Sequence, residues 1–145
     1  MEKINVKRLR EGAQMPTYGT EYAAGADLYA CLDDAVTIEP GETVAIPTGI
    51  AMELPIGTAG LVFARSGLST KRGLAPANKV GVIDADYRGE IKVMLLNHGK
   101  APQRITPGER VAQILVVPVF TPGFQEVEAL SDTVRGVGGF GSTGK

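Results

Sequence analysis

The residue types best suited to chemistry lie in one short segment, residues 81–89, with the sequence GVIDADYRG. There an apolar stretch runs into two carboxylates, Asp84 and Asp86, which are followed by Tyr87 and a glycine. Two nearby carboxylates could act as a general base or bind a metal ion. The same residues could instead form a hairpin whose aspartates only stabilise the turn. Taken alone, the segment leaves both interpretations open.

A second polar cluster contains Arg65, Ser66, Gly67 and Ser69 and opens the best helical candidate, Ser66–Arg72. A guanidinium, a hydroxyl and a backbone N–H group at the start of a helix could hold a phosphate. The simpler interpretation is a surface arginine beside a helix capped by one of the two serines. Without further context the simpler interpretation is favoured.

The last residues, 135–145, are rich in glycine and contain two sizeable apolar side chains, Val137 and Phe140. They cannot bury enough surface to order themselves, so we expect a mobile arm. Residues 139–145 have the G-x-x-x-x-G-K spacing of a phosphate-binding loop, but no helix can follow because the sequence stops at the lysine. Arg135, the glycine amides and Phe140 could still contact a phosphate and stack on a base.

Three further polar residues stand in apolar surroundings and invite explanation. Asp27 lies among small residues, Gln113 interrupts an apolar run, and Asn78 precedes the apolar stretch that leads to Asp84. A buried amide must find partners, so Gln113 either holds backbone or reaches a ligand. The amide of Asn78 could read the edge of a base. For Asp27 the default interpretation is the start of a strand.

The chain that positions these residues is expected to be all-β. It has 145 residues, which indicates one domain, and its 19 Gly and 9 Pro favour short elements joined by tight turns. One helix is expected over Ser66–Arg72, and strands are expected over residues 3–9, 36–38, 43–54, 60–64, 79–83, 90–96 and 111–119. A closed or double-sheet architecture follows from this pattern. Two similar segments, 38–46 and 105–114, indicate either a shared turn solution or pseudo-symmetric strands.

Charge and composition exclude several classes of protein. The net charge of −1 provides no basic field for nucleic acid and no polybasic membrane signal. One Cys permits no internal disulfide, and one Cys with one His rules out a structural Cys/His zinc site. No apolar run is long enough to span a bilayer, and the first residues lack the apolar region of a signal peptide. We therefore expect a cytoplasmic protein without nucleic-acid or membrane partners.

Five segments, taken in order, resemble the five motifs of the trimeric deoxyuridine triphosphatases (dUTPases). They are residues 24–30, 65–69, 78 with 81–91, 108–118 and 135–144. The resemblance implies a β-clip or distorted jelly-roll domain over residues 1–134, with a flexible arm at 135–145 that closes over the active site. It also implies a homotrimer whose active sites are shared between subunits.

The resemblance further implies hydrolysis of dUTP to dUMP and pyrophosphate with Mg²⁺. Asp84 would activate the water that attacks the α-phosphorus, and Arg135 would assist catalysis. Tyr87 would stack on the deoxyribose and exclude a 2′-hydroxyl, while Asp27 would act in the outer shell of the metal. The other substrate-binding positions implied are Arg65, Ser66, Gly67, Asn78, Val82, Ile83, Lys92, Gln113, Phe140, Gly141, Ser142 and Thr143.

Two other functions are compatible with such a fold. A dCTP deaminase shares it, but the glutamate-based site of those enzymes is not evident after residues 65–69. A non-catalytic jelly-roll binding module is the other alternative, because a fold does not fix a function. Such a module would have no reason to combine Asp84 and Tyr87 with the glycine-rich arm.

Overall fold

The computed structural model describes residues 3–141 and consists mainly of antiparallel strands. In chain order the elements are β1 (Asn5–Arg8), β2 (Thr17–Tyr18), β3 (Ala26–Tyr29), β4 (Val36–Ile38), β5 (Thr43–Pro47), β6 (Ile50–Glu53), β7 (Thr58–Phe63), α1 (Ser66–Arg72), β8 (Leu74–Pro76), β9 (Gly81–Ile83), β10 (Lys92–Asn97), β11 (Gln103–Ile105) and β12 (Arg110–Pro118). Each expected apolar segment forms at least part of a strand. The all-β class with one short helix is confirmed.

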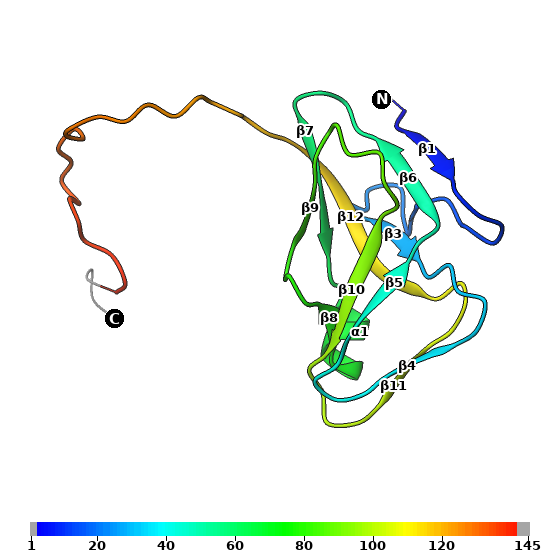
Figure 1. Cartoon of the computed structure of the whole chain (residues 1–145). Helices are drawn as coiled ribbons and strands as arrows, with labels where there is room; N and C mark the ends of the chain where they lie inside the picture. The colour runs from blue at the N-terminus through cyan, green and yellow to red at the C-terminus, as the bar shows by residue number, and fades with distance from the viewer. Residues whose placement is uncertain (1–2, 142–145) are drawn as a thin grey trace.

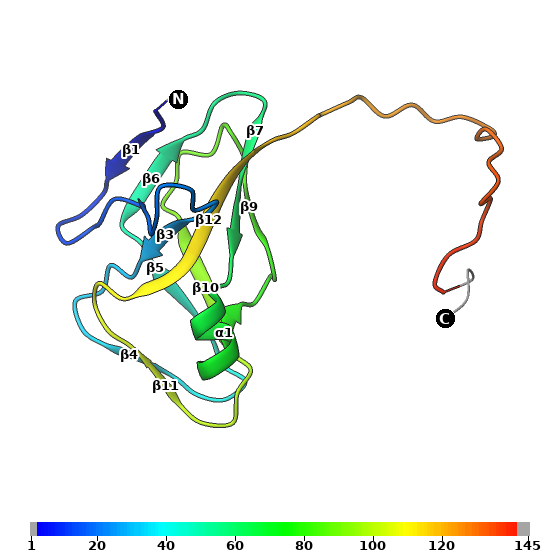
Figure 2. The ribbon, with the colours of Figure 1, turned by 180° about the vertical axis from the view of Figure 1, so that it is seen from behind.

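Two sheets face each other and enclose the core. One has the strand order β2-β3-β12-β7-β9 and the other β5-β10-β8. In Figure 1 β5 and β10 lie in front of β12, and Figure 2 shows β12 in front from the opposite side. Leu28, Val62 and Ile114 of the first sheet share one buried cluster with Val93 and Leu95 of the second. The architecture is therefore the expected double sheet, held together by apolar burial.

The two similar segments form the same kind of turn. Each contains a Pro-Gly pair whose glycine has a positive φ, +80° at Gly41 and +77° at Gly108, as turns of this kind require. The side chain of Glu42 accepts the N–H of the residue three positions earlier at 2.8 Å, and Glu109 does the same at 3.0 Å. The preceding strands β4 and β11 pair with each other, but the following strands β5 and β12 lie in different sheets. The similarity thus reflects a shared turn more than equivalent sheets.

The expected continuous strand over residues 43–54 is wrong, because the chain turns at Thr48 and Gly49 between β5 and β6. Gly49 has φ +68°, and a Cβ there would lie 2.8 Å from Cys31 Sγ. The buried Thr48 hydroxyl donates to the Ile91 carbonyl oxygen at 2.5 Å. Only glycine combines this backbone conformation with so close an approach.

The helix also differs in one detail from expectation. Its N-cap residue is Arg65, with extended backbone and no side-chain capping bond, so neither serine caps it. Gly73 ends the helix in the left-handed conformation, and its N–H bonds the Leu68 carbonyl. Across residues 3–141 no helix is both long and apolar enough to cross a bilayer.

The chain crosses from one sheet to the other between β9 and β10. β9 pairs with β7, whereas β10 pairs with β5 and β8, and no pairing in the described structure joins β9 to β10. The hairpin that was one of the two interpretations of this segment is therefore splayed open. Its loop, residues 84–91, carries the carboxylates and the tyrosine that the sequence singled out.

Asn97 is the principal polar group of the core. It is fully buried, its Nδ2 donates to the carbonyls of Ile38 and Ala101 at 2.9 Å each, and its Oδ1 accepts the Gly99 N–H at 2.9 Å.

We predict that Asn97→Ala lowers the free energy of unfolding by about 2–4 kcal/mol, because buried partners lose their hydrogen bonds. Denaturant titration measures this. The exposed neighbour supplies the control, since His98→Ala should change stability by less than about 0.5 kcal/mol.

Candidate active site

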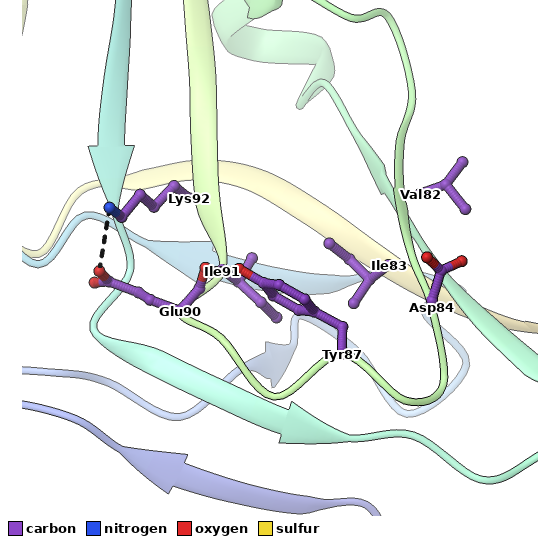
Figure 3. A pocket seen from close by; sticks show the side chains of 7 residues that line it. All are labelled: Val82, Ile83, Asp84, Tyr87, Glu90, Ile91 and Lys92. Carbon is purple, nitrogen blue, oxygen red and sulfur yellow. Dashed lines mark hydrogen bonds and ion pairs between the residues drawn. The ribbon is translucent and has the colours of Figure 1, made fainter.

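A pocket of about 320 Å³ lies beside the loop between β9 and β10. It is lined by Val82, Ile83, Asp84, Tyr87, Glu90, Ile91 and Lys92 (Figure 3). The Asp84 carboxylate stands at one side of this pocket and the Tyr87 ring at the other. Asp86 is exposed and lines neither this pocket nor the smaller one next to it. The geometry thus separates the two carboxylates and places Asp84 where a bound molecule would be reached.

The smaller neighbouring pocket, of about 100 Å³, lies between the splayed strands. Its walls include Asn78 before β9, Gly81–Ile83 of β9 itself, and Lys92–Met94 of β10. β9 has a partner on one side only, and β8 pairs with β10 only from Leu95 onward. The Met94 carbonyl oxygen accepts the Ala77 N–H at 2.7 Å. No strand pairing among residues 3–141 engages the other backbone groups on these two edges across the pocket. Such groups suit a flat ligand that presents both donors and acceptors on its edge.

Tyr87 is held in one position by its own loop. Its hydroxyl donates to the Glu90 carbonyl oxygen at 2.9 Å, and its ring passes so close to Gly89 that a Cβ there would clash with the hydroxyl and the ring. Gly89 is thus needed for the ring to lie flat against the loop. The side chain stays 44% exposed, so a face of the ring is open to a ligand.

A second polar cluster brings together Asp27, Arg65 and Gln113, which lie far apart in the sequence. Asp27 on β3 lies opposite Gln113 on β12. Asp27 Oδ1 accepts a hydrogen bond from Arg65 Nε at 2.8 Å, and Asp27 Oδ2 accepts one from Arg110 Nη1 at 3.3 Å. Within residues 3–141 the terminal nitrogens of Arg65 make no hydrogen bond. Asp27 therefore orients the guanidinium while leaving those nitrogens for an anion.

The contacts of Gln113 explain why a polar residue interrupts this apolar run. Its Nε2 donates to the Ala64 carbonyl oxygen at 2.9 Å, which holds the backbone immediately before Arg65. It also lines a pocket of about 530 Å³ together with Gly25 and Lys79. Gln113 is thus both a structural support and a polar wall of a pocket.

Ser66 and Gly67 occupy the exposed first positions of α1, next to Arg65. A Cβ at Gly67 would meet nothing within 4 Å, so packing does not require glycine here. No hydrogen bond or ion pair among the described residues joins this region to Asp84 or Tyr87. Arg65 follows the end of β7 and Asp84 follows the end of β9, and these two strands are antiparallel, so the two residues lie at opposite ends of the strand pair. One chain therefore presents two separate parts of the predicted site.

The resemblance also predicts a third part of the site, in the C-terminal residues. The last backbone hydrogen bond to the body is from Val119 N to the Gly57 carbonyl oxygen at 2.9 Å, after which the chain extends away (Figures 1 and 2). Arg135 and Phe140 lie in this segment, where Arg135 Nε donates to the Gly138 carbonyl oxygen at 3.0 Å. Phe140 and Gly141 are exposed. Ser142 and Thr143 lie outside the described residues.

Sequence reasoning did not single out Glu90 as a site residue. It was assigned to a strand, whereas the structure places it in the loop, where its side chain meets Arg10 and Gly49. Its position directly after the glycine of the GVIDADYRG segment was the available signal, but its partners could not be seen from local pattern.

A β-sheet enzyme that acts on a phosphate compound would need a pocket with free strand edges, a carboxylate beside it and a cationic cluster, and this fold has all three. The chain belongs to the dUTPase family, whose model matches residues 11–144. It is 53% identical over 143 residues to the deoxyuridine 5′-triphosphate nucleotidohydrolase of Desulfitobacterium hafniense, covering 98% of this chain and 95% of that protein. The protein of the same name from Acinetobacter baumannii is 47% identical over 148 residues, covering 99% of both.

Solved structures of the same family share the fold. A Staphylococcus bacteriophage 80alpha dUTPase with dUpNHpp superposes with a TM-score of 0.92 at 31% identity, covering all of both chains. A mutant dUTPase from phage phi11 of S. aureus, described with a structural Mg(II) ion, has a TM-score of 0.81 at 28% identity, covering 88% of this chain and 98% of that one. The jelly-roll or β-clip type of fold expected from the sequence is confirmed.

We predict opposite outcomes for two glycine-to-alanine changes in the site. Gly89→Ala should displace the Tyr87 ring, break its bond to Glu90 and lower the melting temperature. Gly67→Ala should leave stability unchanged or raise it by up to about 1 kcal/mol, because alanine suits a helix and the space is open. Thermal unfolding and a crystal structure of Gly89→Ala measure these effects. An unmoved ring in that structure would contradict the packing described.

Proposed function

We propose that this chain hydrolyses dUTP to dUMP and pyrophosphate by attack of water on the α-phosphorus. The observation that carries the proposal is the position of Asp84 at the pocket beside the β9–β10 loop, next to the smaller pocket that lies between the edges of β9 and β10. Family membership supports the chemistry, and the geometry supports the roles proposed below for the individual residues. A cytoplasmic location is part of the proposal and rests on the expectations from composition.

The base and sugar would occupy the two adjoining pockets. Uracil presents one N–H donor between two carbonyl acceptors, which backbone groups at Val82, Ile83 and Lys92 can match, with Asn78 assisting. Cytosine has a different pattern of donors and acceptors, so the same edges would reject it. The Tyr87 ring would stack on the deoxyribose and occupy the space of a 2′-hydroxyl.

Asp84 would serve as the general base. Its exposed carboxylate can accept a proton from water as the water oxygen forms a bond to the α-phosphorus. The bond from that phosphorus to the bridging oxygen breaks, and pyrophosphate leaves. The barrier falls mainly because water and phosphate are held in position and the growing charge is neutralised.

The phosphates would be held by Arg65, Ser66, Gly67 and Gln113. Two free guanidinium nitrogens, a hydroxyl and exposed helix N–H groups are suitable donors to phosphate oxygens. Because these residues are not joined to Asp84 within one chain, we propose a homotrimer in which neighbouring subunits complete each site. Exposed apolar side chains beyond the body, among them Phe120 and Phe124, support an assembly that covers them.

Magnesium is proposed as an ion that arrives with the triphosphate. Within residues 3–141 no group of three or more His, Cys, Asp or Glu could hold it, and both oxygens of Asp27 already face arginines. These residues fit an ion bound mainly by phosphate oxygens, with Asp27 accepting hydrogen bonds from its water shell. When bound, the ion neutralises phosphate charge and favours attack at phosphorus.

The general-base role is tested by Asp84→Asn. We expect turnover of dUTP to fall by about 10²–10⁴-fold, because the amide cannot take the proton. Binding of a non-hydrolysable dUTP analogue, measured by calorimetry, should be retained. Asp86→Asn is the matched control and should keep normal turnover. Comparing pyrophosphate release from dUTP, dCTP and UTP in the same assay tests the substrate, and normal kcat in Asp84→Asn would exclude this carboxylate as the base.

The arm, residues 135–145, is proposed to close over bound substrate, with Arg135 on the phosphates and Phe140, Gly141, Ser142 and Thr143 covering the site. Deleting residues 135–145 should reduce kcat/KM by about 10²-fold or more, since contacts made in the closed complex lower the barrier. The melting temperature and oligomeric state should not change. Arg135→Ala should reproduce much of the loss and Arg135→Lys less of it. Normal hydrolysis by the truncated chain would show that the arm is not needed.

A further inference from the structure

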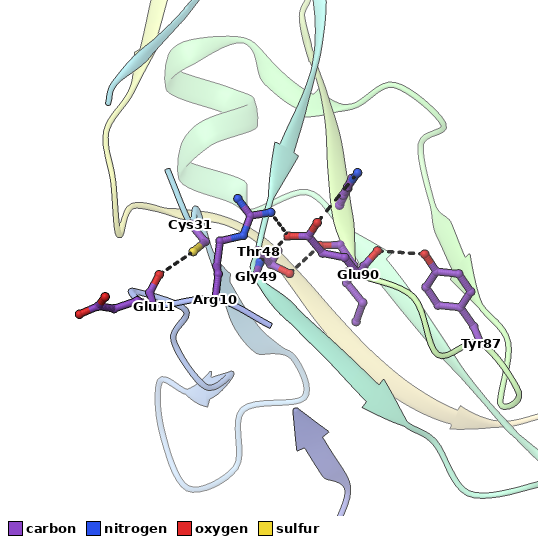
Figure 4. A network of polar contacts seen from close by, with 9 residues as sticks. Arg10, Glu11, Cys31, Thr48, Gly49, Tyr87 and Glu90 are labelled. Carbon is purple, nitrogen blue, oxygen red and sulfur yellow. Dashed lines mark hydrogen bonds and ion pairs between the residues drawn. The ribbon is translucent and has the colours of Figure 1, made fainter. Parts of the chain in front are cut away.

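Glu90 is the centre of a polar network beside the pocket (Figure 4). Its side chain is only 15% exposed. Oε1 accepts the Gly49 N–H at 2.9 Å and a hydrogen bond from Arg10 Nη2 at 2.6 Å. Oε2 lies 3.9 Å from Lys92 Nζ. One carboxylate therefore ties the loop between β9 and β10 to the N-terminal segment and to the corner between β5 and β6.

The main chain around Glu90 is fixed from the same corner. The Ile91 N–H donates to the Ile50 carbonyl oxygen at 2.9 Å, and the Ile91 carbonyl accepts both the N–H and the hydroxyl of Thr48, at 3.2 and 2.5 Å. Side chain and backbone thus hold residues 90 and 91 against residues 48–50. Little freedom is left to the carbonyl of Glu90.

That carbonyl is the acceptor for the Tyr87 hydroxyl, at 2.9 Å. The same end of the ring lies so close to Gly89 that a Cβ there would clash with it. A ring can exclude one hydroxyl group from a sugar only if it does not yield when the larger sugar presses on it, because the difference in size is small. The anchor of the ring is therefore as relevant to sugar selection as the ring itself.

We propose that Glu90, with Arg10, is a positioning residue that holds Tyr87 rigidly and thereby sets the preference for deoxyribose over ribose. This inference rests on the proposed function. Glu90 acts through Tyr87, since Arg10 and Gly49 already engage its carboxylate. Arg10 is 80 residues away in sequence and in no predicted motif, so selectivity extends to a part of the chain outside the pocket.

A merely structural role would lower stability without altering the choice of sugar. The two roles are separated by measuring kcat/KM for dUTP and for UTP, together with the melting temperature, in the full-length assembled protein. Glu90→Ala should raise the ratio of UTP to dUTP efficiency by about tenfold, the scale of discrimination given by one small group. Glu90→Gln keeps an acceptor for Gly49 but loses the ion pair, so its ratio should lie between those of Glu90→Ala and the unmodified protein.

A double-mutant cycle tests whether Glu90 acts through the tyrosine. Tyr87→Phe removes the hydroxyl, and it too should raise the UTP to dUTP ratio. The double variant should show no larger change than the greater of the two single changes, because both remove the same restraint. Additive effects would overturn the coupling. Glu39→Ala is the control and should leave the ratio unchanged, because this exposed side chain makes no hydrogen bond or ion pair within residues 3–141.

Arg10→Ala keeps the proposal falsifiable if Glu90→Ala does not fold. Arg10 is 45% exposed, so its loss is tolerable, and the ratio should still rise by about threefold. An unaltered ratio in Arg10→Ala and in every folded Glu90 variant, with normal dUTP hydrolysis by the unmodified protein, overturns this inference alone. If the unmodified protein releases no pyrophosphate from dUTP, the proposed function fails and the inference fails with it.

Discussion

The crossing of the chain from one sheet to the other between β9 and β10 determines most of what this molecule can bind. Strands joined by a short loop ordinarily pair, and their backbone groups then satisfy one another. Here β9 pairs with β7 while β10 pairs with β5 and β8, so the edges between them are left for a ligand. The packed core fixes how far apart the two sheets stand, and thus the width of the opening. The proposed reading of a flat base in this pocket therefore depends mainly on backbone groups.

The loop that borders such a pocket needs support from residues outside the pocket. A loop that connects two sheets has no strand pairing of its own to stabilise it. The carboxylate of Glu90 stabilises this loop instead, by bonding to Gly49 and Arg10. In the arginine cluster, Asp27 performs a comparable task for Arg65. In both places a carboxylate orients a neighbouring group of the protein. Asp84 differs, because it makes no such contact with the described residues and remains exposed.

Local pattern was sufficient for much of this structure. Alternating apolar residues indicated most of the strands, and turn residues marked many of their ends, because those signals depend on neighbours in the chain. The short strands β2, β8 and β11 were not predicted. The breaks in the strands and their pairing were harder to predict than the existence of the strands. The break at Gly49 depends on the thiol of Cys31, and the splaying of β9 from β10 depends on which strands compete for their edges. Glu90 was missed for the same reason, since its partners lie 41 and 80 residues away. The five ordered motifs indicated the family because together they span nearly the whole chain.

The separation of Asp84 from Arg65 within one chain has a consequence for inheritance. If neighbouring subunits complete each site, two inactivating mutations in different copies of the gene need not abolish activity when both copies are expressed together. A chain lacking the carboxylate can still contribute its arginine cluster to a neighbour, and a chain lacking the arginine can contribute its pocket. Mixed assemblies of two individually inactive chains would then contain some intact sites. Two alleles damaged at opposite ends of the site would complement each other, whereas two damaged at the same end would not.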